Sequence, residues 1–394
     1  MAKEIVIVSA CRTAIGKFMG TLSSLSAPQL GGKVIKSAVE RAGIKNDIID
    51  EVIMGCVVQG GLGQAPARQA AINAGLPSTI SAFTINKVCG SGLKAVMLAS
   101  QAIKAGEGEC IVAGGFESMS NVPYYLDKAR YSGYKYGDGK LIDGLIHDGL
   151  FCAFAKKHMG FLGDFTAKNS NITRKECDEF SYNSQKKAAA AMKSGVFKNE
   201  IIDVEIPQRK KDPIVFNTDE GVRETTPEIL AKLPAVFEKD GVITPGNASQ
   251  LSDGASASVV MSKSKAEELN IKPLAKIVGY SDAHIETNML FYAPETAIKK
   301  LLTSINWDIN TVDLWELNEA FSSQAVANAK NLGIPSEKIN VNGGAIALGH
   351  PIGASGTRVL TTLIYALKNK GLKKGVTSLC LGGGGAVAMA IEII

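Results

Sequence analysis

The sequence predicts an α/β protein built from two similar halves, and three observations lead to this prediction. Short apolar stretches alternate with amphipathic helical stretches, which is typical of sheets covered by helices. Glycine is frequent, with 41 residues among 394, as expected where backbones pack closely. The order of these stretches in the first half recurs in the second half, which indicates an internal duplication.

Four pairs of segments carry the duplication. Pro28 and Pro294 each fall in the first turn of a helical stretch, where the missing N–H of proline costs nothing. The matching pairs are helices 29–42 and 295–304, strands 50–54 and 313–317, helices 93–103 and 357–367, and strands 111–113 and 378–381. Strands that alternate with helices predict parallel sheets, and the matching halves predict two such layers packed face to face.

The region between the halves, roughly residues 121–250, breaks this alternation and is rich in Tyr, Lys and Asp. Thr173 and Glu176 form a capping-box pattern that predicts a helix through Ala191, ending near Gly195. The apolar segment 255–261 predicts a buried strand that returns to the first half. We therefore expect an inserted module on a double core.

Composition narrows the functional classes. A formal net charge of +5 is too small and too scattered to favour a nucleic-acid partner. Seven cysteines without a CxxC pattern indicate reduced thiols rather than disulfides or zinc, and four histidines make a metal site unexpected. No apolar run reaches membrane-spanning length, so no membrane association is expected. With no evident targeting segment, we expect a cytoplasmic protein.

Two residues in matching loops of the halves are candidates for nucleophilic chemistry. Cys89 precedes Gly90-Ser-Gly at the start of a predicted helix, whose N-terminus would favour a thiolate. His350 lies in Gly349-His-Pro-Ile-Gly, and it could take the proton of Cys89 if the loops converge. Taken singly, each has a structural alternative: a buried cysteine, and a histidine bonded within a glycine-rich turn.

Two further positions could complete such a site. Cys380 ends a strand before the glycine run that begins at Gly382, whose N–H groups could hold an oxyanion while the thiol moves a proton. Asn318, in Asn318-Glu-Ala-Phe, could donate to a polarised carbonyl or hold a water. The structural alternatives are a core cysteine and the N-cap of a helix over residues 322–332.

Together these motifs closely resemble the thiolase family, and the resemblance covers essentially the whole chain. The motifs that carry it are Cys89-Gly-Ser-Gly, His158-Met-Gly, Asn318-Glu-Ala-Phe, Gly349-His-Pro-Ile-Gly and Cys380-Leu-Gly-Gly-Gly-Gly. The resemblance implies a five-layered α-β-α-β-α core of two duplicated halves with an inserted loop domain. It implies a first half of residues 1–120 with 251–272 and a second half of 273–394. Between them, the loop domain of 121–250 would bind coenzyme A and make oligomer contacts.

The resemblance also implies roles for individual residues. Cys89 would be the acylated nucleophile, His350 its activating base, and Cys380 the group that moves the α-proton of the substrate. One oxyanion hole would combine the His350 ring with a water on Asn318, and the other the N–H groups of Cys89 and Gly382. The expected coenzyme A contacts are Leu150, His158, Met159, Arg223, Ala248, Ser249, Ala320 and Phe321.

The implied activity is that of an acetyl-CoA C-acetyltransferase, which reversibly condenses two acetyl-CoA to acetoacetyl-CoA and coenzyme A through an acetylated Cys89. No metal or other cofactor is expected, and a homotetramer is usual for this type. Met159 favours short acyl chains in the family. Leu290 and Phe291, however, replace a frequent Met-Gly beside the acyl pocket.

Three alternatives are open. The first is a broader-chain 3-ketoacyl-CoA thiolase of fatty-acid breakdown. The second is a ketosynthase-like enzyme, against which Cys380 before four glycines argues, because that class typically has a Cys-His-His set. The third is a non-catalytic coenzyme A-binding or lipid-binding protein on the same fold, which the intact motifs disfavour.

Overall fold

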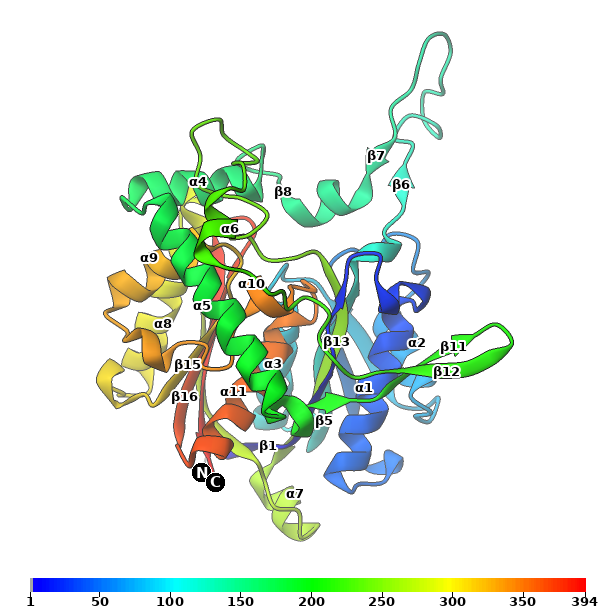
Figure 1. Ribbon diagram of the computed structural model, residues 1–394. Helices are drawn as coiled ribbons and strands as arrows, with labels where there is room; N and C mark the ends of the chain where they lie inside the picture. The colour runs from blue at the N-terminus through cyan, green and yellow to red at the C-terminus, as the bar shows by residue number, and fades with distance from the viewer. Residues whose placement is uncertain (1–2) are drawn as a thin grey trace.

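A computed structural model describes residues 3–394 and has two α/β halves whose strands follow one continuous path (Figure 1). In the first half the strand order is β4–β3–β5–β13–β1, and the second half continues it as β14–β17–β16–β15. The strands of the first half are β1 (Ile5–Thr13), β3 (Glu51–Gly55), β4 (Ser81–Ile85), β5 (Cys110–Ser118) and β13 (Ser252–Ser262). Those of the second are β14 (Ala275–His284), β15 (Leu314–Leu317), β16 (Lys374–Leu381) and β17 (Gly385–Ile393).

Helices form three layers around these strands, which confirms the five-layered arrangement. On the outer face of the first half lie α1 (Ala27–Ala42) and α2 (Pro66–Asn73), and on that of the second lies α8 (Ala293–Ser304). Between the halves, α3 (Ser91–Ala105) packs on α11 (Ser355–Lys370), and both bury apolar side chains against strands of both halves. The N-termini of α3 and α11 therefore lie close together at the centre of the molecule.

The strand directions differ from the expected parallel sheets. The pairs β3–β4, β3–β5, β15–β16 and the short pair of β1 with β10 (Ile201–Ile202) are parallel, whereas the pairs that β13 makes with β5 and that β17 makes with β16 are antiparallel. The parallel rule applies to strands joined by a crossover helix. By contrast, β13 arrives from the inserted region, and β17 follows β16 through a short glycine turn. Helices cover both faces, so these strands remain as apolar as parallel ones.

The duplicated helices begin where the prolines predict. Pro28 and Pro294 lie in the first turns of α1 and α8. A capping box of Ser26 with Gln29 adds to the start of α1, and Gly43, with φ of +67°, ends it. Local sequence is sufficient for these boundaries because caps and prolines act within one turn.

The inserted region between β5 and β13 packs mainly on the second half (Figure 1). Its helices are α4 (Met159–Asn169), α5 (Arg174–Lys193) and α6 (Pro227–Ala231), and the predicted capping box of Thr173 with Glu176 opens α5. Its short strands are β6 (Tyr124–Tyr125), β7 (Ile142–Asp143), β8 (Phe151–Cys152), β9 (Lys157–His158), β10 (Ile201–Ile202), β11 (Val204–Gln208) and β12 (Lys211–Phe216). Two segments project outward, the loop between β6 and β7 and the β11–β12 hairpin (Figure 1).

The remaining α-helices are α7 (Lys263–Glu268), α9 (Ser322–Leu332) and α10 (Ala345–Leu348), and β2 (Gly16–Lys17) pairs with the first two residues of β13. No helix within residues 3–394 is long and apolar enough to cross a membrane.

Candidate active site

The loop that carries Cys89 joins β4 to α3 through a strained turn. Val88 has φ of +48°, a left-handed conformation that is costly for a β-branched residue. The Oδ1 atom of Asn86 accepts a hydrogen bond from the Val88 N–H at 2.9 Å. The Ser91 hydroxyl donates to the Val88 carbonyl at 2.6 Å. The turn places Cys89, half-buried, at the N-terminal end of α3.

The surroundings of Cys89 raise the pKa of its thiol to about 12. Burial is the main cause, and it outweighs hydrogen bonds to the sulfur from the backbone N–H groups of Cys89 and Gly382. The expectation that the helix N-terminus favours the Cys89 thiolate is therefore wrong in its outcome, because desolvation exceeds the favourable dipole. A nearby base has to accept the proton before the sulfur can attack.

His350 lies on the loop between α10 and α11 and presents such a base. Its Nδ1 atom is 2.6 Å from the Ser355 hydroxyl oxygen, and that hydroxyl donates to the Pro351 carbonyl at 2.9 Å. Since the hydroxyl hydrogen is already used, the oxygen accepts from Nδ1–H, and Nε2 keeps its lone pair. Burial first, and Arg358 second, lower the pKa of His350 to about 3. The ring is thus neutral near pH 7.

Cys380 lies at the end of β16 beside the glycine turn. Burial first, and the charge of Cys89 second, raise the pKa of the Cys380 thiol well above its usual value. In the turn, Gly383 and Gly384 have φ of +86° and +93°, a conformation that only glycine adopts cheaply. This turn directs the N–H of Gly382 toward Cys89.

These groups converge on one cavity of about 320 Å³ with mainly apolar walls. Eleven of the thirteen residues predicted for the site line it: Cys89, Leu150, His158, Met159, Ala248, Ser249, Ala320, Phe321, His350, Cys380 and Gly382. Leu290 and Phe291, noted in the sequence as departures beside the acyl pocket, line it as well. A cavity of this kind suits an apolar chain with a reactive carbonyl at its end.

Two predicted residues lie outside the cavity wall. Asn318 is buried behind His350, with its Nδ2 atom 3.4 Å from Nε2 of His350. Its Oδ1 atom has no hydrogen-bond partner among the described residues. Asn318 is not the N-cap of α9, because Phe321 occupies that position and makes no side-chain cap. Arg223 does not line the cavity, and its N–H donates to the side chain of Gln185.

Several lining residues were not predicted from the sequence. Phe237 stacks on His158 with ring centroids 4.8 Å apart, and Met119, Ile146 and Ile352 add apolar wall. Their side chains carry no chemistry and look like ordinary core residues in a sequence. An acidic residue within an apolar strand is a stronger signal, and Glu117 near the end of β5 is one that the motifs did not include.

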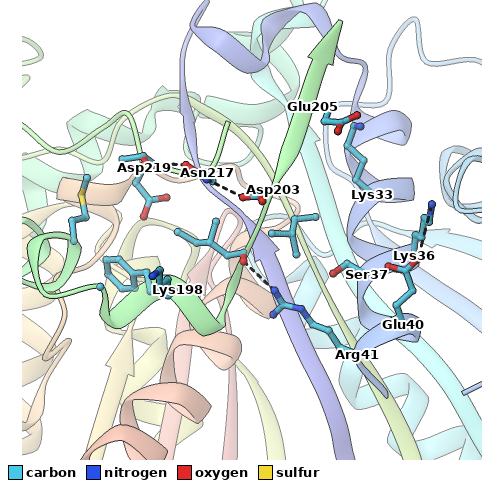
Figure 2. A pocket seen from close by; sticks show the side chains of 16 residues that line it. Lys33, Lys36, Ser37, Glu40, Arg41, Lys198, Asp203, Glu205, Asn217 and Asp219 are labelled. Atoms are coloured by element: carbon cyan, nitrogen blue, oxygen red, sulfur yellow. Dashed lines mark hydrogen bonds and ion pairs between the residues drawn. The ribbon is translucent and has the colours of Figure 1, made fainter. Parts of the chain in front are cut away.

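A second cavity, of about 950 Å³, is open and lies between α1 and two stretches of the inserted region, residues 192–205 and 217–219 (Figure 2). Charges of both signs line it, among them Lys36 and Glu40, which are 3.9 Å apart. Arg41 donates to the carbonyls of Asn199 and Ile201. None of the predicted site residues lines this cavity, so the cavity at Cys89 is the candidate active site.

The fold and this site define an acyltransferase. Comparison with known proteins agrees: residues 5–264 match the family model described as "Thiolase, N-terminal domain", and residues 271–393 match "Thiolase, C-terminal domain". The chain belongs to the thiolase family.

Similar proteins cover the whole chain. A protein of Cupriavidus necator called acetyl-CoA acetyltransferase is 52% identical over 390 residues, 99% of each chain. One of the same name from Escherichia coli is 50% identical over 391 residues, again 99% of each. The crystal structure of the Bacillus anthracis acetyl-CoA acetyltransferase superposes with a TM-score of 0.98 at 40% identity, covering 100% of this chain and 99% of that one.

Proposed function

We propose that this chain is an acetyl-CoA C-acetyltransferase that condenses two acetyl-CoA to acetoacetyl-CoA and free coenzyme A, or catalyses the reverse. The observation that carries the proposal is the convergence of Cys89, His350 and Cys380 on one apolar cavity. The relatives that share the name acetyl-CoA acetyltransferase along their whole length support the choice of substrate.

In the first half-reaction, Nε2 of His350 takes the proton from the Cys89 thiol as the sulfur attacks the acetyl carbonyl. The N–H groups of Cys89 and Gly382 hold the oxyanion that forms. The carbon–sulfur bond to coenzyme A then breaks, and the leaving thiolate takes the proton back from His350. The thioester exchange leaves acetyl-Cys89.

In the second half-reaction, His350, neutral again, accepts the proton of the Cys380 thiol, and the Cys380 thiolate removes a proton from the methyl group of a second acetyl-CoA. The resulting enolate attacks the carbonyl of acetyl-Cys89, and Cys89 leaves as a thiolate that takes the proton back from His350. Burial raises the pKa of the Cys380 thiol, and an ionised Cys89 would raise it further. Acetyl-Cys89 cannot ionise, so the second half-reaction forms only one thiolate at a time.

The enolate oxygen needs donors of its own, because the α-proton of a thioester is only weakly acidic. We assign this role to Nε2–H of His350, which carries the proton taken from Cys380 at this stage, and to a water held by Asn318. The buried and unpartnered Oδ1 of Asn318 supports a water at this position. Every step uses groups of the chain and the two thioesters, so we propose no metal or redox cofactor.

The acyl and pantetheine parts of coenzyme A fit the apolar cavity, with Leu150, His158, Met159, Ala248, Ser249, Ala320 and Phe321 as proposed contacts. Arg223 lies away from this cavity, so we assign any contact it makes to the nucleotide end of coenzyme A. Met159 approaches Gly382, at which an added Cβ would lie 3.2 Å from the Met159 terminal carbon. This crowding favours acetyl over longer groups.

The test is mass spectrometry after incubation with acetyl-CoA. We expect an acetyl adduct on the peptide that contains Cys89, absent in Cys89→Ser and retained in Cys177→Ser, whose buried cysteine lies in α5. Turnover with an unmodified Cys89 would refute the mechanism. A higher rate with a longer 3-ketoacyl-CoA than with acetoacetyl-CoA would instead favour the broader-chain thiolase.

We further propose a homotetramer in the cytoplasm. The loop between β6 and β7 projects from the molecule (Figure 1) and exposes large side chains, of which Tyr131 and Tyr136 are almost fully exposed. Such a cluster is typical of an interface. All seven cysteines are free of disulfides, which suits a reducing compartment. Light scattering of the purified chain tests the tetramer, and a monomer would refute it.

A further inference from the structure

Glu117 is a buried charged residue that the proposed chemistry does not use. It lies near the end of β5 with no exposed surface. Its carboxylate accepts hydrogen bonds from the N–H groups of Val57 at 3.0 Å, Val58 at 3.2 Å and Gly353 at 2.9 Å, and from the Cys56 thiol at 3.5 Å. An ionised carboxylate has about four lone-pair sites and no hydrogen to donate, so it matches four donors.

The partners of Glu117 belong to both halves of the protein. Val57 and Val58 follow β3 in the first half, whereas Gly353 lies on the loop that carries His350 in the second. The contact with that loop is tight, because a Cβ added at Gly353 would lie 2.8 Å from the Glu117 carboxylate and 2.7 Å from the carbonyl of Phe116. The loop of His350 therefore rests directly on the end of β5.

A second connection leads from Glu117 to Cys89. The Val57 carbonyl accepts a hydrogen bond from the Asn86 side-chain amide at 3.3 Å. The Oδ1 atom of the same Asn86 accepts from the N–H of Val88 at 2.9 Å. Val88 is the strained residue whose conformation places Cys89 in the cavity. A continuous hydrogen-bonded path thus runs from the His350 loop through Glu117 to the Cys89 loop.

We propose that Glu117 is a positioning residue that holds the His350 loop and the Cys89 loop in the geometry for proton transfer between them. The proposal rests on the proposed function. Glu117 does not touch the reacting atoms and acts through the two loops. Misplacement of reacting groups by about 1 Å can lower the rate about 100-fold. Preventing that loss justifies the free-energy cost of burying a carboxylate between the two loops.

The charge of Glu117 works against reactivity, which supports a positioning role. Cys56 and Cys89 are the titratable groups whose pKa values its charge raises, as a cause secondary to burial in both. Burial also raises the pKa of Glu117 itself to about 7. If the residue at this position served only to make Cys89 more reactive, an acid would be unfavourable, because its negative charge raises the pKa of the Cys89 thiol.

The decisive variant is Glu117→Gln, in which the amide turns two donor hydrogens toward groups that are themselves donors. Asp253→Asn is the matched control. Asp253 is equally buried, and burial raises its pKa too, but it accepts from Ser118 and Ser120 rather than from the catalytic loops. We expect Glu117→Gln to lower kcat about 100-fold with KM for acetyl-CoA nearly unchanged, and Asp253→Asn to keep wild-type kcat.

Alkylation of Cys89 by iodoacetamide, followed by peptide mass spectrometry, gives a second readout that needs no coenzyme A. At pH 8 and above, Glu117→Gln should alkylate several-fold faster than wild type, because a negative charge near the thiol is gone. Well below pH 7, where Glu117 is already neutral, the two rates should agree. Asp253→Asn should follow wild type at every pH.

A folded Glu117→Gln with wild-type kcat would overturn the proposal, as would an equal loss in Asp253→Asn. If Glu117→Gln fails to fold, Asn86→Ala breaks the same path at an exposed residue, and normal kcat in that variant would overturn it as well. A wild-type protein that neither forms nor cleaves acetoacetyl-CoA would refute the proposed function instead.

Discussion

Ser355→Ala tests whether the tautomer of His350 controls the acetylation of Cys89. In the structure the Ser355 oxygen accepts the Nδ1 hydrogen at 2.6 Å, while the Ser355 hydroxyl donates to Pro351. Alanine removes the acceptor, and the buried Nδ1–H loses its partner. The tautomer with the hydrogen on Nε2 then gains population, and in that form His350 cannot take a proton from Cys89.

The size of the effect follows from this hydrogen bond. A buried donor left without a partner costs about 1–3 kcal/mol, and each 1.4 kcal/mol is a factor of about ten. We therefore expect the acetylation rate to fall about 5-fold to 150-fold. Ser355 is fully buried and does not line the cavity, so KM for acetyl-CoA should change little.

The assay is rapid-quench mixing with acetyl-CoA, followed by intact-protein mass spectrometry of the acetylated fraction. Thr357→Val is the matched control on the same helical turn, because the Thr357 hydroxyl has no hydrogen-bond partner in the described part of the chain. Thermal melting of both variants checks the fold. Acetylation of Ser355→Ala at the wild-type rate, or an equal loss in Thr357→Val, would refute the reasoning.

Three further predictions address the second half-reaction, the acyl pocket and stability. Cys380→Ser should still form the acetyl adduct but should condense poorly, as measured by acetoacetyl-CoA formation; loss of the adduct would contradict the division of labour. Met159→Ala should raise the rate with a longer 3-ketoacyl-CoA relative to the rate with acetoacetyl-CoA. An unchanged ratio of the two rates would show that Met159 does not limit the acyl length. Arg12→Met should lower the free energy of unfolding by about 3–5 kcal/mol in urea titrations. The reason is that Glu200 and Asp219 lose the buried guanidinium that lies 2.6 Å and 2.7 Å from their carboxylates. A decrease of less than about 1 kcal/mol would show that these carboxylates tolerate burial without a cation.

Much of the fold was predictable because its signals are local. The prolines of α1 and α8, the capping box of α5 and the apolar strands act within one turn or one strand, and each element formed where it was expected. Strand direction was not predictable in this way. It depends on whether a strand is reached by a crossover helix, by a hairpin or from an inserted region.

The same difference between local and long-range signals applies to the active site. The glycine-flanked motifs predicted which loops meet, and Cys89, His350 and Cys380 do line one cavity. The position of Cys89 at a helix N-terminus, however, predicted a lowered thiol pKa, whereas burial raises the pKa of this thiol to about 12. Glu117 gave one signal, an acid in an apolar strand, which did not indicate its partners. Its partners lie far away in the chain, at Val57 and Gly353.

The sequence by itself thus determined the chemical groups, the duplication and the loops that carry them, because residue type and backbone preference are properties of short segments. Only the tertiary structure decided the protonation of Cys89, the tautomer of His350, the walls of the acyl pocket and the partners of Glu117. These properties depend on desolvation and on hydrogen bonds whose partners lie from 5 residues apart, as for His350 and Ser355, to 236 residues apart, as for Glu117 and Gly353. Neither the burial nor the geometry of these bonds exists until the chain has folded.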